Sequence, residues 1–187
     1  MEGNPKEYGT SKKYQRSHQI NFPDCKFILE TVQCWQAKGY PVAPKDLFIL
    51  HSSLPCQSFS EANKGKDKGE CELDIELAVC MAKTILDLCP KYWTIEQVPG
   101  FADSKSWAIA KTMLAPYYHG TAQVIKLKEY GIPQDRVRLF GMYSLKNLPI
   151  LELPKKQPIS GWGGCGNFPA ESLLLHPPFT YVSFHIL

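Results

Sequence analysis

The chain has 187 residues, of which 44% are hydrophobic, 21% charged and 12% aromatic. This composition excludes a disordered tail and a fibrous repeat, and the length is enough for one domain with a buried core. The formal net charge of +3 is too small to indicate a nucleic-acid partner by itself, and it does not oppose one. No apolar run approaches the ~20 residues of a membrane span, so we expect no membrane partner.

The cysteines predict neither a disulfide framework nor a metal site. There are seven of them, no secretory signal is readable, and no Cys-x-x-Cys pair is present. We interpret most of them as small core residues in a reducing compartment. Cys56 stands apart because Pro55 precedes it and Gln57 follows it.

The first half of the chain is expected to contain two strands and two helices. The polar residues 1–19 lead into a short helix, and the apolar residues 27–32 favour a strand. Residues 46–51 include four apolar residues in a row, which is typical of a strand buried on both faces. Residues 73–89 are apolar around most of a helical circumference, and Pro90 ends the predicted helix.

The second half continues the alternation of strands and helices. Residues 92–95 favour a strand, and Ser104 is suited to cap a helix that runs to residue 115. Further strands are expected at 122–127 and 138–143. Strands that alternate with helices predict an α/β fold with a largely parallel sheet. Functional groups then gather at the carboxyl ends of the strands.

Three short polar motifs lie beside the predicted strands: Pro55-Cys56-Gln57, Glu96-Gln97-Val98 and Gln134-x-Arg136-x-Arg138. A thiol that follows a strand and a proline can act as a nucleophile, although such a cysteine is more often structural. A carboxylate at a strand end can act as a proton donor with a raised pKa, although a solvated turn is the commoner case. Two arginines two residues apart share one face of a strand and can clamp an oxygen, although a surface pair is more usual.

In this order the three motifs resemble those of the cytosine-5 DNA methyltransferases, whose pattern is Pro-Cys-Gln, Glu-Asn-Val and Gln-x-Arg-x-Arg. The resemblance covers residues 10–145. Gln97 stands where the family has asparagine. This glutamine and the stretch 50–56, followed by 65–67, look most like the fungal branch associated with premeiotic silencing and repeat-induced mutation.

The resemblance implies a partial, Rossmann-like S-adenosylmethionine-dependent methyltransferase fold and a DNA (cytosine-5-)-methyltransferase activity. Cys56 matches the nucleophile that adds to C6 of a flipped-out cytosine. Glu96 matches the acid that contacts N3 and the exocyclic amine of the base. Arg138 matches the residue that holds O2, and Arg136 would brace the loop. The methyl group would pass from S-adenosylmethionine to C5.

The resemblance also implies binding residues. Those expected at the cofactor are Pro55, Glu30 and Leu77. Those expected at the substrate are Leu54, Gln57, Ser60 and Gln134. The loop 58–71, with glycines at 65 and 69, resembles the mobile loop that closes over the base.

Two parts of the family's pattern are missing. The sequence contains no Phe-x-Gly-x-Gly turn, which in the family cradles the methionine part of the cofactor. It also lacks most of the DNA-reading region. We therefore expect a chain truncated at both ends. Residues 1–150 would be a partial catalytic domain, and residues 151–187 would be a Pro/Gly-rich remnant of the target-recognition region or an irregular tail, with an apolar stretch at 179–187 that is either a strand or an irregular end.

The expected partners are DNA and, to supply the missing turn, a second chain. The family implies a nuclear location. Two alternatives remain open at this point. One is a catalytically inactive, methyltransferase-like module that binds nucleic acid or supports a partner. The other is a tRNA cytosine-5 methyltransferase, because one branch of the family modifies RNA with the same motifs.

Overall fold

The computed structural model describes residues 15–25, 28, 30–40, 42–45, 47–55, 57–59, 69–153, 156 and 181–185. The strands among these residues are β1 (Ile49–Ser53), β2 (Tyr92–Gln97), β3 (Tyr118–Lys126), β4 (Val137–Leu145) and β5 (Tyr181–His185). The α-helices are residues 15–21, α2 (Val32–Lys38), α3 (Glu72–Leu88) and α4 (Lys105–Leu114). The shorter 3₁₀ helices are η1 (Gln57–Phe59), η2 (Pro99–Asp103) and η3 (Leu127–Tyr130).

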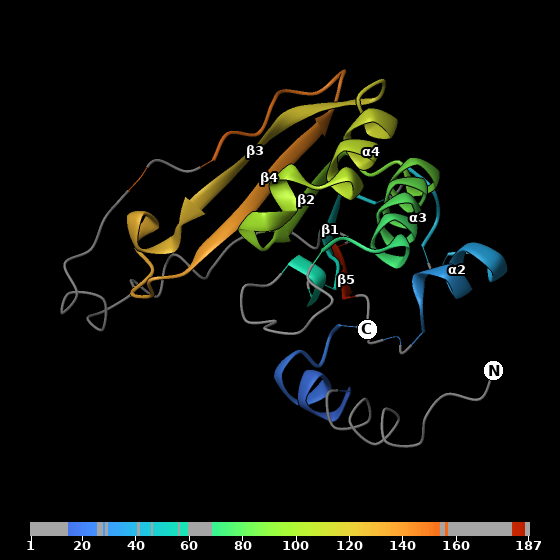
Figure 1. Ribbon diagram of the computed structural model, residues 1–187. Helices are drawn as coiled ribbons and strands as arrows, with labels where there is room; N and C mark the ends of the chain where they lie inside the picture. The colour runs from blue at the N-terminus through green and yellow to red at the C-terminus, as the bar shows by residue number, and fades with distance from the viewer. Residues whose placement is uncertain are drawn as a thin grey trace.

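The strands form one mixed sheet in the order β3-β4-β2-β1-β5 (Figure 1). β1 pairs in parallel with β2 and β5, whereas β4 pairs antiparallel with β2 and β3. The α/β class is therefore confirmed, but the expectation of a largely parallel sheet is wrong. The physical reason lies in residues 127–136, which join β3 to β4. They are fewer than the roughly dozen residues that a crossover between parallel neighbours needs, so β4 folds back as a hairpin.

β1 lies inside the sheet, with β2 on one side and β5 on the other. The chain moves from β1 to β2 in one direction, and the later β5 takes the place on the opposite side of β1. Ligands of open α/β sheets bind at such reversals of strand order, outside the carboxyl ends of the strands. β5 falls within the stretch 179–187, for which a strand was one expectation.

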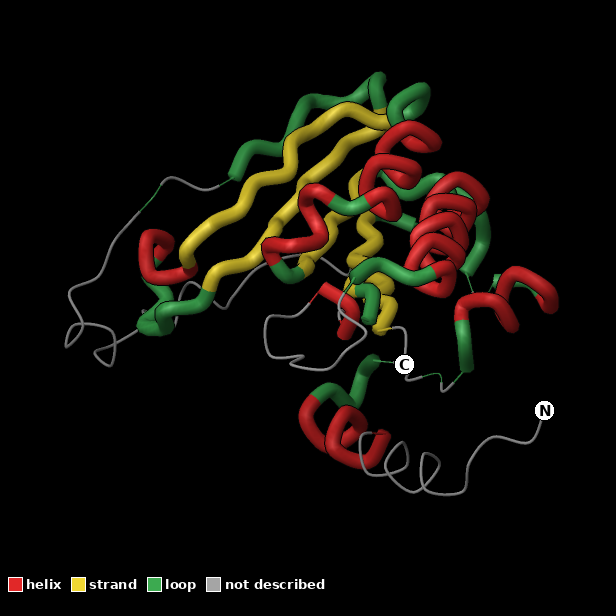
Figure 2. Tube along the Cα trace, viewed as in Figure 1, coloured by secondary structure: helices red, strands yellow, loops and turns green. Residues whose placement is uncertain are grey.

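Helices α3 and α4 pack against one face of the sheet (Figure 2). Ser104 caps α4, because its Oγ accepts the backbone N–H of Trp107 at 3.0 Å. The start of α3 is closed by Asp74, whose carboxylate accepts the N–H of Cys71 at 2.8 Å. Both helices lie within one residue of the predicted bounds. The cap predicted at Ser104 is confirmed.

The amino-terminal part differs from the prediction. Residues 28, 30 and 31 of the expected strand 27–32 are described, and none is in a strand; Val32 begins helix α2 instead. Thr31 supplies the helix signal, because its hydroxyl accepts the N–H of Cys34 at 3.3 Å. The helical residues 15–21 agree with the short helix expected after the polar start.

The core between α4 and the sheet is aromatic. Trp93 on β2 is 1% exposed and stacks on Tyr143 of β4, with ring centroids 4.3 Å apart and planes 6° from parallel. Trp107 of α4 contacts both rings edge-on, and Tyr118 of β3 contacts Trp93 in the same way. Burial raises the pKa of Tyr143 to about 12. Such pairs contribute about 0.5–1.5 kcal/mol each beyond the area that they bury, so this cluster is a main source of stability.

Two glycines make room for this packing. A Cβ at Gly120 would collide with the carbonyl oxygen of Met142 and lie 2.7 Å from the Cα of Tyr143. A Cβ at Gly141 would lie 2.7 Å from Cγ2 of Ile95 and 2.9 Å from the ring of Tyr143.

None of the helices in the described part of the chain has the length and apolar character to span a bilayer.

Candidate active site

An ion pair joins the carboxyl end of β2 to the amino end of β4. Glu96 is paired across the sheet with Phe140, and Arg138 lies two residues before Phe140 on β4, on the same face. Arg138 Nε lies 3.0 Å from Glu96 Oε1. The two side chains are 21% and 26% exposed, so water is partly excluded and the pair remains open to a ligand. The antiparallel insertion of β4 is what brings these two residues together.

Both oxygens of the Glu96 carboxylate have partners. Arg138 holds Oε1, and the hydroxyl of Ser53, at the end of β1, donates to Oε2 at 3.4 Å. The long distance makes the second bond weak, so a better donor on a ligand can replace it. Sequence reasoning missed Ser53. The signal that could have identified Ser53 is its position as the last residue of β1, because the carboxyl ends of neighbouring parallel strands lie at the same edge of the sheet.

Arg138 is also fixed by its own backbone. Its Nη1 donates to the carbonyl of Val137 at 2.7 Å, while Nε faces Glu96. A guanidinium carries five N–H donors in a rigid plane, so these two contacts leave donors for a carbonyl oxygen of a ligand. The arrangement offers a carboxylate and a guanidinium, side by side, to a planar polar ring. A carboxylate accepts from an amine, and a guanidinium donates to a carbonyl.

Gln97 points to the opposite face of the sheet and is 2% exposed. Its Nε2 donates to the carbonyl of Leu54 at 2.8 Å, and its Oε1 accepts the N–H of Val98 at 2.7 Å. Leu54 is buried, and Pro55 is half-buried at the end of β1. The backbone that leads to the Pro55-Cys56-Gln57 motif is therefore held against the Glu96-Gln97-Val98 motif.

The other predicted site residues have different positions. Arg136 and Gln134 are exposed in the turn before β4. Glu30 forms a surface ion pair with Lys38, at 3.2 Å. Leu77 is buried in α3 and 7% exposed. The predicted residues that lie outside the described part of the chain are Cys56, Ser60 and the side chain of Gln57.

The expectation that most cysteines are core residues is wrong for the described ones. Cys80 is buried, and burial raises the pKa of its thiol. Cys89 is half-buried at the end of α3. The exposed cysteines are Cys25, Cys34 and Cys71. Each lies near an end of a helix or in a turn, outside the regular pattern of buried and exposed positions. No cluster of metal-ligating side chains occurs among the residues that the structure describes.

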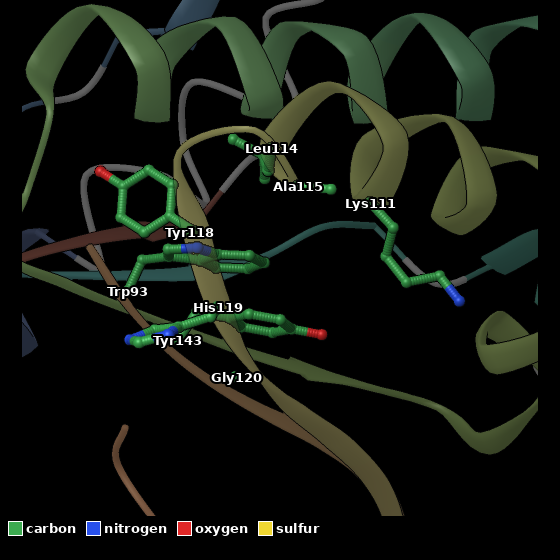
Figure 3. Close-up of a pocket in the computed structure, with 8 residues that line it drawn as sticks. All are labelled: Trp93, Lys111, Leu114, Ala115, Tyr118, His119, Gly120 and Tyr143. Carbon is green, nitrogen blue, oxygen red and sulfur yellow. The ribbon is translucent and has the colours of Figure 1, made fainter. Parts of the chain in front are cut away.

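A cavity of about 290 Å³ lies at the other end of β2 (Figure 3). Trp93 and Tyr143 stack in its floor and Leu114 lies above them on α4, while Lys111 and His119 add polar groups to its wall. Nε1 of Trp93 is buried without a hydrogen-bond acceptor in the described part of the chain. Trp93 precedes Glu96 by three residues on the strand, so the cavity is separate from the ion pair.

A known protein family matches the part of the chain that carries the three motifs. Residues 8–160 match the family described as C-5 cytosine-specific DNA methylase. The chain belongs to this family. The match includes both strand ends that carry the Glu96–Arg138 pair and the Pro55-Cys56-Gln57 motif. C-5 cytosine methyltransferases use S-adenosylmethionine as their methyl donor.

The similar curated proteins are larger methyltransferases. The chain is 26% identical over 151 residues to the type II methyltransferase M.XorII of Xanthomonas oryzae pv. oryzae, which covers 74% of this chain and 34% of that protein. It is 29% identical over 126 residues to DNA (cytosine-5)-methyltransferase CMT2 of Oryza sativa subsp. japonica, covering 62% and 9%. It is 23% identical over 134 residues to the tRNA (cytosine(38)-C(5))-methyltransferase of Rattus norvegicus, covering 71% and 34%. The chain thus spans about a third of these proteins or less.

A solved structure of DNMT2 from Spodoptera frugiperda has the same fold. It superposes with a TM-score of 0.51 at 19% identity, over 76% of this chain and 45% of that chain. The S-adenosylmethionine-dependent methyltransferase fold expected from the sequence is therefore confirmed.

Proposed function

We propose that this chain carries the base-binding and nucleophile half of a DNA (cytosine-5-)-methyltransferase. The observation that supports it most is the Glu96–Arg138 ion pair, which lies at the sheet edge where β1 leads into the Pro55-Cys56-Gln57 motif. A cytosine ring presents, on one edge, an amine donor, a ring nitrogen and a carbonyl oxygen. A guanidinium can donate to the carbonyl oxygen, and a carboxyl group can accept from the amine with one oxygen and, when the other oxygen is protonated, donate to the ring nitrogen.

In the proposed reaction, the thiolate of Cys56 adds to C6 of the cytosine, and a sulfur–carbon bond forms. The electron pair of the C5–C6 double bond then makes C5 nucleophilic. Negative charge develops toward N3, where Glu96 supplies a proton or a hydrogen bond, while Arg138 donates to O2. After methyl transfer C5 loses its proton to a base, the thiolate leaves C6, and the double bond is restored.

The base competes for partners that the free protein already uses. Arg138 donates to Glu96 at 3.0 Å, and Ser53 donates to the same carboxylate at 3.4 Å. When O2 of the base takes free donors of Arg138 and its amine replaces Ser53, the carboxyl group of Glu96 keeps a partner on each oxygen.

S-adenosylmethionine would supply the methyl group to C5. The donor set fits its adenosine end in part: the carboxylate of Glu30 can accept from ribose hydroxyls once it releases Lys38, and Leu77 and Pro55 are apolar. The sequence offers no Phe-x-Gly-x-Gly turn for the methionine end. Glu30, Leu77 and Pro55 thus remain proposed cofactor residues, and the methionine end has no proposed partner in this chain.

The substrate base must leave the duplex to reach such a site, at a cost of a few kcal/mol. We propose that Leu54, Gln57, Ser60 and Gln134 line its path, that Arg136 braces the turn before β4, and that the loop 58–71 closes over it. Lysines of that loop would meet phosphates, which makes binding salt-dependent.

Finer assignments rest on the sequence. The fungal branch, the truncation at both ends and the division at residue 150 remain proposals that the motifs support. A nuclear location remains a proposal that rests on the resemblance to the family. Only the motif pattern supports the proposal that a second chain supplies the missing turn.

RNA is the second candidate substrate. The similarity to a protein named as a tRNA (cytosine(38)-C(5))-methyltransferase favours it. The same three motifs would perform the same chemistry, so the substrate must be decided by experiment. The third reading, an inactive nucleic-acid-binding module, predicts binding without covalent chemistry.

The test traps the covalent intermediate. The protein is mixed with S-adenosylmethionine and either a DNA oligonucleotide or a tRNA that contains 5-fluorocytosine, which cannot lose its C5 substituent. We expect a DNA adduct that withstands denaturation, that disappears in Cys56→Ala and that persists in Cys34→Ala, a matched variant of an exposed thiol on α2. An adduct with tRNA alone would establish the second candidate. Binding of DNA with no adduct would contradict the enzyme and support the inactive module.

A further inference from the structure

The cavity at the end of β2 that carries Trp93 has the size of a small-molecule site (Figure 3). Its volume of about 290 Å³ lies near the lower end of the range for ligand pockets. An engineered apolar cavity of about 150 Å³ holds one benzene ring. The cavity beside Trp93 therefore has room for a ligand of about two fused rings.

The floor of this cavity is flat and aromatic. The rings of Trp93 and Tyr143 are stacked, with centroids 4.3 Å apart and planes 6° from parallel. Gly120 on β3 leaves the ring of Tyr143 uncovered, because a Cβ at this position would lie 2.8 Å from Cδ1 of Tyr143. Leu114 adds an apolar side chain from α4. Flat rings pack well on such a surface, so the shape favours a planar aromatic ligand.

The charge of the cavity comes from Lys111, an exposed residue of α4 whose Nζ lies 5.5 Å from the centre of the Trp107 ring. Among the residues that the structure describes, Lys111 has no ion-pair partner, and none of those lining the cavity is an aspartate or a glutamate. Aromatic walls alone would also suit a cation, but the ammonium of Lys111 would repel it. The charge therefore favours an anion.

Tyr143 offers a second donor. Its hydroxyl has no hydrogen-bond partner among the described residues, and burial raises the pKa of Tyr143 to about 12, so the hydroxyl keeps its proton at neutral pH. In Figure 3 this hydroxyl points away from His119 and toward the side on which Lys111 lies. His119 is already engaged, because its Nε2 donates to the carbonyl of Leu148 at 2.8 Å. A carboxylate has two acceptor oxygens, which suits an ammonium and a hydroxyl.

We propose that this cavity binds a flat aromatic carboxylate of about two fused rings. The rings lie against the stacked pair Trp93 and Tyr143, and the carboxylate accepts from Lys111 and from the hydroxyl of Tyr143. The site is separate from the Glu96–Arg138 pair, so the proposal does not depend on the proposed function. Because the ligand contacts α4, β2, β3 and β4 together, it would stabilise the folded state by mass action.

The test uses three probes of the same shape and different charge. Isothermal titration calorimetry measures the binding of naphthoate, of neutral naphthamide and of cationic naphthylmethylammonium. We expect naphthoate to bind with a dissociation constant on the order of 10⁻⁴ M, as suits a ligand of this size. Naphthamide should bind about fivefold more weakly, the loss of one partly exposed ion pair, and the cation more weakly still.

Two pairs of variants place the binding in this cavity. Ala115→Leu adds a side chain at an exposed residue that lines the cavity and should weaken naphthoate binding at least about tenfold by taking up its space. Ala108→Leu, at an exposed position of α4 away from the cavity, is its control. Lys111→Gln should lower the affinity for naphthoate to that for naphthamide, whereas Lys105→Gln, in the first turn of α4, should leave it unchanged.

A wild type that binds no naphthoate at millimolar concentration would overturn the proposal. Equal affinity for naphthoate and the cation would overturn it as well, and so would naphthoate binding that Ala115→Leu leaves unchanged. Sedimentation velocity tests the other occupant of such a cavity, a side chain of a second copy. Self-association that Ala115→Leu abolishes, without naphthoate binding by the wild type, would show that occupant and contradict the small-molecule site.

Discussion

The two ends of β2 and β4 differ in kind although the same pair of strands builds both. At one end Trp93 and Tyr143 stack, and Trp107 and Tyr118 close over them. At the other end Glu96 and Arg138 form a half-exposed ion pair beside the last residue of β1. Trp93 at the aromatic end and Glu96 at the polar end are three residues apart on β2. The rigid aromatic end fixes the strands, and the polar end is thereby held in register without contributing much stability itself.

We predict that substitutions at the polar end affect the rate of the reaction, whereas substitutions at the aromatic end affect the stability of the fold. Exposed or half-exposed ion pairs contribute about 0–1 kcal/mol, whereas buried tryptophans contribute several kcal/mol. Variants of the polar end should therefore lose reaction and keep stability. Variants of the aromatic end should lose stability and keep the reaction wherever they still fold.

The largest effect is expected for Glu96→Gln, which keeps the shape of the side chain and removes the proton donor. Adduct formation should fall about 10²- to 10⁴-fold, the usual contribution of a positioned general acid, while the melting temperature changes little. Rapid-quench measurement of the adduct gives the rate. Glu129→Gln, in an ion pair with Lys156, is the control for removing a paired carboxylate elsewhere. A rate in Glu96→Gln within threefold of this control would contradict the role of Glu96.

Trp93→Ala tests the other end. Removal of a side chain that is 1% exposed should lower the free energy of unfolding by about 3–5 kcal/mol. Urea denaturation followed by circular dichroism measures it. Trp93→Phe serves as the graded control, because it keeps an aromatic ring on Tyr143 and should lose less. A loss below 1 kcal/mol in Trp93→Ala would show that the aromatic end does not dominate stability.

Gly141→Ala tests how tightly the two ends are joined. Its Cβ would lie 2.7 Å from Ile95 and 2.9 Å from Tyr143, so we expect a loss of about 1–3 kcal/mol from overpacking. Thermal unfolding measures the loss. Since Ile95 is next to Glu96, a large decrease in adduct rate without a loss of stability would mean that the ends are less independent than proposed.

Glu70→Gln is expected to have the smallest effect. The carboxylate accepts the backbone N–H groups of Lys105 and Ser106, at 2.9 and 2.5 Å, and thus caps α4. Partial burial raises the pKa of Glu70, but the bonds from Ser106 and Lys105 outweigh it, so the pKa is lowered from its ordinary 4.5. The stabilisation is therefore fully present above the ordinary pKa and is lost as pH falls through the lowered one.

Above pH 5 the Glu70→Gln variant should be less stable than the wild type by about 1 kcal/mol, the usual value for a cap. The difference should shrink as the solution is acidified below the ordinary pKa. Urea titrations at several pH values provide the measurement. A difference that grows on acidification would have the wrong sign and would refute the capping role.

Sequence reasoning found local features well. Ser104 before a helical pattern and Pro90 after one are signals that act over a few residues, and α3 and α4 follow them closely. The resemblance assigns Glu96 and Arg138 to the same base, and their roles remain predictions, but their ion pair with each other was not predicted. Glu96 and Arg138 come together because β4 lies between β2 and β3 in the sheet, and no local sequence pattern encodes that position.

The features that were missed depend on pairing between distant segments. The bond from Ser53 to Glu96 and the reach of Gln97 to Leu54 appear only once β1 and β2 are side by side. The apolar run 27–32 favours a strand, but so short a run cannot distinguish a strand from other structure, and the cap at Thr31 begins helix α2 at Val32. The antiparallel direction of β4 was not predicted either, because strand direction is set by the length of the connection and by packing against other strands.

The most direct test of the account is release of tritium from cytosine without any methyl donor. Addition of the Cys56 thiolate and proton supply by Glu96 make C5 exchange its hydrogen with water, so the polar end alone should perform this reaction. The measurement is tritium released into water from an oligonucleotide labelled at C5 of cytosine. The account predicts release by the wild type and by Cys34→Ala, and background release by Cys56→Ala and Glu96→Gln. A wild type that binds the oligonucleotide and releases no tritium above background would contradict it.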